Sequence, residues 1–403
     1  MSCAVDPIED DGPKSAYDEI SDDERTTLVN KVADAIKDLP VDSGFWAFMW
    51  LAPVKKLRKW VEVFVNYSEV TQCDVVQSTK WTRALKYWTA RLPMKDSVAV
   101  DAVPAEGELK KSKSTKRKAA TAAPKDKGSP KAPRLDESVS NQLAPAVLAP
   151  ALDSPVQPEH TRSSAAVNNC GKRDKEKCLV TGLADCVHKA HIYPSTISEN
   201  SATREHELWW GRLAEFYPKE KIEAWETAIS GPDSTEILPN LLCLCSHVHQ
   251  MWDDGKIGFK FKQREPDGSA MTVEFHWLYK HEHGLRNLRT APTNPIGLQR
   301  SNLGSRLHDC ESSRILTSGD RLVWTTERPS GKDAWPLPSE DLLEMKWALN
   351  RLVALSGAAD VPDEELDPDD PVGLAPPIAV ETEADSVEER PDGRKYAYQP
   401  KAD

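Results

Sequence analysis

The sequence predicts an α+β protein, because stretches with helical spacing of apolar residues surround segments that alternate as strands do. Apolar residues recur every three to four positions in 24–92, 205–229 and 339–355. In 256–277 they alternate with polar residues instead. A stretch rich in Ala, Pro, Ser and Lys, at 96–168, separates the first helical region from the rest. We therefore expect two folded parts joined by a linker.

Composition divides the chain further. Only 39% of the 403 residues are hydrophobic and 30 are proline, so part of the chain is expected to remain unpacked. Segments without sustained periodicity bury too little apolar surface to offset their ordering entropy. We predict a disordered acidic N-terminus (1–24), a small helical module (25–95), a disordered basic linker (96–168), a folded domain with a C-terminal helix (169–357) and a disordered acidic tail (358–403).

The first helical module shows a clear apolar stripe. Val29, Val32, Ala33 and Ile36 follow the i, i+3, i+4, i+7 spacing of one helix face. Large aromatic residues supply enough volume for a small core, and the alternative is an aromatic face that binds a protein partner. The tryptophans concerned are Trp46, Trp50, Trp60, Trp81 and Trp88.

The second folded part mixes both periodicities. Helices are expected over 205–217 and, with Pro218 in its first turn, over a following segment to Ile229. Ser246 is a candidate cap for a short helix that runs through Asp253. The alternating segments 256–263 and 271–277 flank Asp267-Gly268 and predict a β-hairpin with a longer loop.

Charge is arranged in blocks. The net charge is −12, yet a basic cluster occupies 110–134 and the acidic residues concentrate after 360, so a basic surface for nucleic acid is not excluded. The absence of a long apolar run argues against a membrane span, and the acidic start argues against a secretory route. The segment KKSKSTKRK resembles a nuclear localisation signal, the alternatives being a solvated basic linker and a cytoplasmic protein; its basic residues are Lys110, Lys111, Lys113, Lys116, Arg117 and Lys118.

Three residues carry the chemistry that the sequence offers. His191, Asn240 and His249 occur in that order in three short segments, 178–194, 238–245 and 246–259. A neutral imidazole can take a proton from water near neutral pH. An Asn carbonyl and a second imidazole can hold a divalent cation, with Mg²⁺, Mn²⁺ or Zn²⁺ all compatible. Such parts suit hydrolysis of a phosphodiester.

The surrounding motifs resemble the HNH endonuclease domain widespread in fungal proteins, a branch of the ββα-metal nucleases. The resemblance covers about 175–280. Its motifs are Cys178-Leu-Val-Thr-Gly182, Ala190-His191-Ile192-Tyr193-Pro194, Asn240-Leu-Leu, Leu244 followed by His249 and Trp252-Asp253, and VEFHW at 273–277.

The resemblance implies a ββα-metal core, with inserted helices and the hairpin following it. His191 would be the catalytic general base. Asn240 would be a catalytic residue that orients the hairpin loop or a catalytic group near the metal, and it would also be a metal ligand. His249 would ligate the metal, and Asp253 would orient His249. Many HNH nucleases carry an acidic metal ligand just before the general base, where this chain has Ala190.

Each assignment has a structural alternative. The two histidines and Asn240 would then be buried or loop-stabilising groups, and the neighbouring His188 and His247 are expected on the surface. The cysteines near the site lack the spacing of a zinc ribbon, so packing is expected rather than structural zinc. Two classes follow. One is a metal-dependent endonuclease acting on nucleic acid, with DNA the expected substrate. The other is a catalytically weak or inactive HNH-fold module that acts as a regulator by binding nucleic acid or protein.

Overall fold

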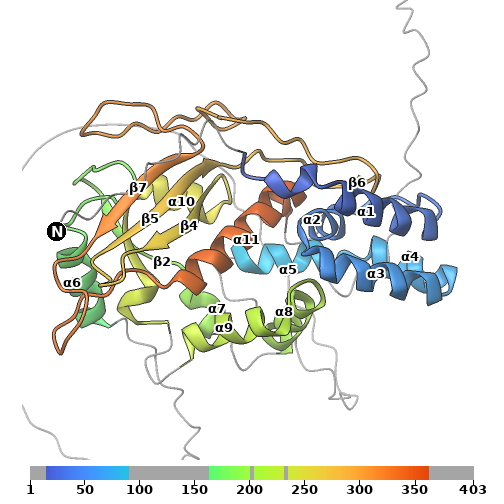
Figure 1. Cartoon of the computed structure of the whole chain (residues 1–403), viewed down its shortest axis with the longest axis horizontal. Helices are drawn as coiled ribbons and strands as arrows, with labels where there is room; N and C mark the ends of the chain where they lie inside the picture. The colour runs from blue at the N-terminus through green and yellow to red at the C-terminus, as the bar shows by residue number, and fades with distance from the viewer. Residues whose placement is uncertain (1–14, 90–162, 200–203, 231–234, 363–403) are drawn as a thin grey trace, which may run out of the picture. The chain divides into compact units, whose positions relative to one another are not determined.

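The computed structural model describes residues 15–89, 163–199, 204–230 and 235–362, and all of these belong to one compact unit. The fold is α+β, as expected, with helices and small antiparallel sheets (Figure 1). Most of the predicted N-terminus, linker and tail lies outside the described residues, as does the basic cluster KKSKSTKRK. Within the described residues, no helix is both long and apolar enough to span a membrane.

The N-terminal region is helical. The predicted apolar stripe lies on α1, and Val29, Val32, Ala33 and Ile36 are buried. All five tryptophans of this region are buried too, which makes them core residues. A protein partner for this module stays a prediction. The elements are η1 (Asp18–Ser21), α1 (Asp23–Ala35), β1 (Val41–Asp42), α2 (Ser43–Leu51), α3 (Val54–Asn66), α4 (Glu69–Gln77) and α5 (Lys80–Thr89).

The second region begins with a helix and then an antiparallel strand pair that is interrupted by helices. Strand β2 pairs with β3, and β3 runs directly into helix α10. The inserted α9 begins after Pro218, which is at the N-cap rather than in the first turn. The elements are α6 (Ser164–Arg173), β2 (Val187–His191), α7 (Ser195–Glu199), α8 (Arg204–Phe216), α9 (Lys219–Ile229), η2 (Leu238–Asn240), β3 (Leu241–Cys245) and α10 (Ser246–Asp253).

The predicted hairpin is present, and a third strand extends it. Strand β4 (Ile257–Arg264) pairs with β5 (Ala270–Trp277), and β5 pairs on its other edge with β7 (Asp320–Thr325). Strand β7 was not predicted from the sequence, because it follows a long stretch without regular periodicity. A short strand, β6 (Leu285–Arg286), pairs with β1 of the N-terminal region.

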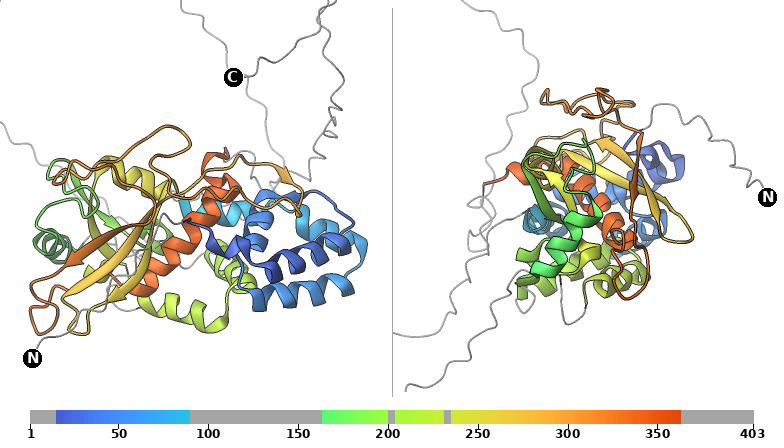
Figure 2. Two further views of the ribbon diagram at one scale, coloured as in Figure 1. Left: turned by 45° about the horizontal axis from the view of Figure 1, so that its top comes forward. Right: turned by 90° about the vertical axis from the view of Figure 1, so that its left-hand side faces the viewer.

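The C-terminal helix α11 (Glu340–Ser356) joins the two regions. It packs against β4 and also against α2 and α5, so it lies between the sheet and the N-terminal helices (Figures 1 and 2). The Ser339 hydroxyl caps its start, and Gly357, with φ of 70°, ends it before η3 (Ala358–Asp360). Almost the whole helix is buried, as expected for a helix covered on two sides.

One buried amide on α11 ties both regions to the end of α10. The Asn350 Nδ2 donates to the carbonyl of Trp252 at 2.6 Å and to that of Ile257 at 3.3 Å. Its Oδ1 accepts the indole N–H of Trp88 at 3.2 Å. Because every polar atom of this side chain has a partner, Asn350 fixes the position of α5 relative to α10.

A buried carboxyl at the start of α2 makes stability depend on pH. The Asp42 Oδ1 accepts from the backbone N–H groups of Gly44 and Phe45, and the Thr82 hydroxyl donates to the same carboxyl at 2.9 Å. Burial raises the pKa of Asp42 to about 7, despite these hydrogen bonds, which lower it.

The sign of this pH dependence follows from proton binding. The pKa of Asp42 in the folded protein lies above that in the unfolded chain, so the folded state binds more protons between about pH 4 and 7. The contribution of Asp42 to the free energy of unfolding is therefore fully present at low pH and is lost as the pH rises through about 7. We expect urea unfolding to give a lower free energy at pH 8 than at pH 5, and the Asp42→Asn variant to show a smaller decrease. An equal decrease in both proteins would contradict this assignment.

Candidate active site

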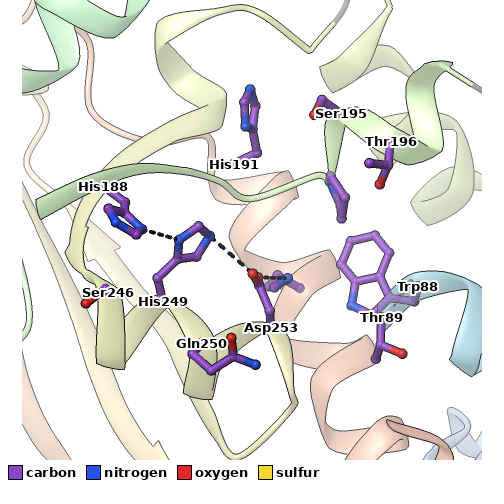
Figure 3. Close-up of a pocket in the computed structure, with 12 residues that line it drawn as sticks. Trp88, Thr89, His188, His191, Ser195, Thr196, Ser246, His249, Gln250 and Asp253 are labelled. Carbon is purple, nitrogen blue, oxygen red and sulfur yellow. Dashed lines mark hydrogen bonds and ion pairs between the residues drawn. The ribbon is translucent and has the colours of Figure 1, made fainter. Parts of the chain in front are cut away.

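A pocket of about 400 Å³ lies where the strand pair, the inserted helices and the N-terminal region meet (Figure 3). Strand β2 contributes His188 and His191, and α10 contributes His249 and Asp253. The remaining wall comes from the start of α7, from the end of α5 and from Lys346 of α11. Segments far in sequence from β2, β3 and α10 therefore complete the pocket.

The alternation of β2 decides where its side chains point. His188 and Ala190 are two residues apart and share one face, whereas His191 belongs to the opposite face. Ala190 is fully buried and pairs with Leu242 across the sheet. In Figure 3 the His191 ring accordingly points away from the pair formed by His188 and His249.

His191 is held by a carboxylate. Its Nε2 lies 2.7 Å from Oε1 of Glu236, and both side chains are only about one-seventh exposed, at 14% and 13%. A neutral imidazole that donates Nε2–H to Glu236 carries its basic lone pair on Nδ1. The carboxylate thus selects one tautomer and one ring orientation, as a general base requires.

His249 lies between two other side chains. Its Nε2 is 3.2 Å from Oδ2 of Asp253, one turn further along α10. Its Nδ1 is 3.4 Å from Nδ1 of His188, and the two rings are nearly perpendicular (Figure 3). Asp253 is therefore placed to orient His249, as the resemblance suggested. His188 is exposed, and it also lines the pocket.

A buried lysine supplies positive charge at the same place. The Lys346 Nζ is 3.3 Å from Oδ1 of Asp253, and the residue is only 2% exposed. The rings of Trp88 and Trp252 lie 5.0 and 4.7 Å from this ammonium group. The ion pair and the two aromatic faces together offset the free-energy cost of removing the ammonium group from water.

Asn240 is a buried structural residue in this geometry. Its Oδ1 accepts from the backbone N–H of Tyr193 at 2.8 Å, and its Nδ2 donates to the carbonyls of Tyr193 and Thr235. The residue is fully buried and does not line the pocket. These contacts suit the loop-orienting role that we considered for Asn240. They give no support to Asn240 as a metal ligand or as a group that touches substrate.

One part of the pocket offers the kind of donor that a divalent metal ion needs. The imidazole of His249, with the Asp253 carboxylate behind it, is an oriented nitrogen donor at the edge of an open pocket. Imidazole nitrogen suits Zn²⁺, Mn²⁺ and related ions. This part of the site therefore fits a divalent metal.

A second group of potential ligands fits a metal poorly. Cys170, Asp174 and Cys243 place ligand atoms within 4.8 Å of one another, and they are buried. Arg173 donates to both carboxylate oxygens of Asp174 and already neutralises it. The Cys243 thiol and burial raise the pKa of the Cys170 thiol, which favours the neutral form over the thiolate that a metal needs.

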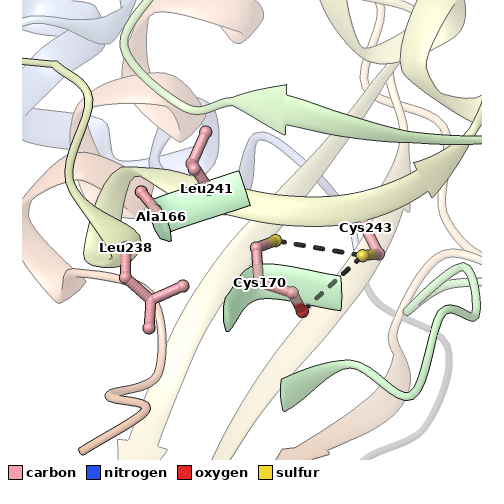
Figure 4. Packing of buried hydrophobic residues seen from close by; sticks show 5 residues of the cluster. All are labelled: Ala166, Cys170, Leu238, Leu241 and Cys243. Carbon is pink, nitrogen blue, oxygen red and sulfur yellow. Dashed lines mark hydrogen bonds between the residues drawn. The ribbon is translucent and has the colours of Figure 1, made fainter. Parts of the chain in front are cut away.

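These cysteines pack as small apolar residues. Cys170 on α6 and Cys243 on β3 belong to a hydrophobic cluster between the helix and the strand (Figure 4). Their sulfur atoms are 3.8 Å apart and no disulfide joins them. Arg173 extends from the same helix and donates to the carbonyls of Leu238 and Leu241, so α6 fastens the start of β3.

Several residues of the site were absent from our sequence-based assignment. Glu236 precedes Asn240 by four residues but belongs to no motif that would distinguish it from a surface acid. Lys346 and Trp88 lie far from the ββα elements in sequence, so only the packing of α11 and α5 brings them to the pocket. His188 was expected on the surface and is exposed, but its place at the pocket was not predicted; strand alternation could have put it on the face of Ala190.

The pocket is lined by an imidazole oriented by a carboxylate and, from the other face of β2, by a second pair of imidazoles, and these are groups that a hydrolytic site needs. Residues 178–260 match the family model described as HNH endonuclease, and this segment contains β2, β3, α10 and the start of β4. The chain thus carries an HNH endonuclease domain, which indicates nuclease activity on nucleic acid. No curated protein and no solved structure matches the chain.

Proposed function

We propose that this protein is a metal-dependent endonuclease that hydrolyses phosphodiester bonds in DNA, with His191 as the general base. The observation that carries the proposal is the 2.7 Å contact between His191 and Glu236 at a pocket that also contains His249. The motif order and the Trp-rich insertion between β2 and β3 support assignment to the fungal-type branch of the HNH family.

The chemistry divides among the side chains of the pocket. His191 donates its Nε2–H to Glu236 in a hydrogen bond and accepts a proton from the attacking water at Nδ1. When bound, a divalent ion would stabilise charge on the phosphate and on the leaving oxygen. His249 would hold this ion, and Asp253 keeps the His249 ring in place. Lys346 contributes a fixed positive charge to a pocket that must accept a phosphate.

The test is a cleavage assay on the full-length protein. Supercoiled plasmid, single-stranded DNA and RNA are incubated with Mg²⁺, Mn²⁺ or Zn²⁺, with EDTA as the metal-free control. We expect nicking of DNA with at least one metal and none with EDTA. Binding of nucleic acid without cleavage under every metal would instead favour the inactive HNH-fold module, and cleavage of RNA alone would revise the substrate.

For the location of the protein we propose the nucleus, with KKSKSTKRK as the import signal. The cluster concentrates six basic residues within nine positions, which is the composition that import signals share. Replacing all six by alanine in a fluorescent fusion should move the protein to the cytoplasm. The control replaces Lys125, Lys127 and Lys131 in the same segment and should leave the distribution unchanged. A nuclear signal that survives the first replacement would reject this cluster as the import signal.

A further inference from the structure

The pocket contains one histidine that neither the family match nor the proposed mechanism assigns a task. His188 lies on β2, three residues before His191, and it shares a strand face with Ala190. Ala190 carries no side-chain donor, so the ligating group that this face of β2 presents is the imidazole of His188.

The distance between the two imidazoles suits a shared cation better than a direct hydrogen bond. The Nδ1 atoms of His188 and His249 are 3.4 Å apart. Hydrogen bonds between nitrogen donors and their acceptors are usually near 2.9–3.0 Å, so this contact is long. Two nitrogen ligands about 2.0–2.1 Å from a tetrahedral ion are separated by about 3.3 Å. The observed separation is close to that value.

The orientation of the His249 ring directs its Nδ1 atom toward His188. Asp253 lies on the opposite side of the ring, with its Oδ2 3.2 Å from Nε2. In the tautomer whose proton is on Nε2, beside this carboxylate, the lone pair is on Nδ1, the atom that faces His188. Lys346 Nζ lies 3.3 Å from the other oxygen of Asp253 and so helps to hold this carboxylate beside His249.

We propose that His188 and His249 bind one divalent cation through their Nδ1 atoms, with His188 supplying the ligand that Ala190 cannot. The chemistry of two imidazoles selects Zn²⁺, Mn²⁺, Co²⁺ or Ni²⁺ over Mg²⁺, which prefers oxygen ligands. The remaining positions of such an ion stay open toward the pocket for water or a phosphate oxygen. The use of this ion in cleavage rests on the proposed function, whereas its binding does not.

Direct metal binding is the test. The full-length protein is titrated with Zn²⁺ or Co²⁺ by isothermal calorimetry, and the Co²⁺ complex is followed by its visible absorption. Loss of an orienting partner typically weakens metal sites about 10–100-fold, so His188→Ala should weaken this site by at least as much. His249→Ala should do the same. The matched control is His247→Ala, an exposed histidine on the same helix that does not line the pocket.

Three outcomes separate this proposal from the proposed function. His188→Ala should unfold at the wild-type temperature without metal, because its side chain is exposed, but should lose the stabilisation that added Zn²⁺ gives the wild type. Equal affinity in His188→Ala, His247→Ala and wild type would overturn the proposal even if the protein cleaves DNA. Selective loss of binding in His188→Ala, in a protein that cleaves no nucleic acid, would sustain the metal site and reject the nuclease.

Discussion

Replacement of His191 by alanine should lower the rate of DNA cleavage by about 10²–10⁴-fold, the usual contribution of a positioned general base. The physical reason is that no other imidazole among the described residues is paired with a carboxylate on this face of β2. His188 and His249 lie on the other side of the strand and are occupied with each other and with Asp253. The measurement is single-turnover cleavage of plasmid under saturating metal.

Two further variants locate the cause of this loss. Glu236→Gln keeps a hydrogen-bond acceptor near Nε2 but removes the charge, so it should lower cleavage less than His191→Ala. His247→Ala should cleave as the wild type does. Because His191 is absent from the proposed metal site, His191→Ala should bind Zn²⁺ with unchanged affinity. Equal nicking by wild type and His191→Ala would assign the activity to another site or to a contaminant.

Asn240→Ala should destabilise the fold by about 2–5 kcal/mol, because it leaves several buried backbone groups without their partners. The side chain satisfies the N–H and the carbonyl of Tyr193 and the carbonyl of Thr235, and it is fully buried. Tyr193 follows His191 by two residues, and Thr235 precedes Glu236. The loss of these hydrogen bonds should therefore displace both His191 and Glu236. Urea unfolding monitored by tryptophan fluorescence measures the stability.

The metal affinity of this variant distinguishes the two roles considered for Asn240. If Asn240 only orients the loop, Asn240→Ala should bind Zn²⁺ as tightly as the wild type at a temperature where both are folded. A selective loss of metal affinity with little change in stability would make Asn240 a ligand after all. Asn294→Ala offers a matched control, since its amide also bonds to backbone but lies far from the pocket residues in sequence.

Two elements of the fold have local signals in the sequence. The spacing of Val29, Val32 and Ala33 predicted the buried face of α1, and the alternation around Asp267-Gly268 predicted the hairpin β4–β5. Both patterns repeat within a few residues, so each can be recognised without knowing the partner element. The strand β7 was missed because its six residues are flanked by long irregular segments and gain their place only by pairing with β5.

The sequence by itself determined the α+β class, the order of His191, Asn240 and His249, and the helix that carries His249. These properties follow from residue type and short-range periodicity. The tertiary structure decided that His191 faces Glu236, that His249 faces His188, and that Lys346 closes the pocket. The reason is that strand alternation, loop hydrogen bonds and the packing of α11 bring together residues as far apart as Trp88 and Lys346, and no local pattern encodes such contacts.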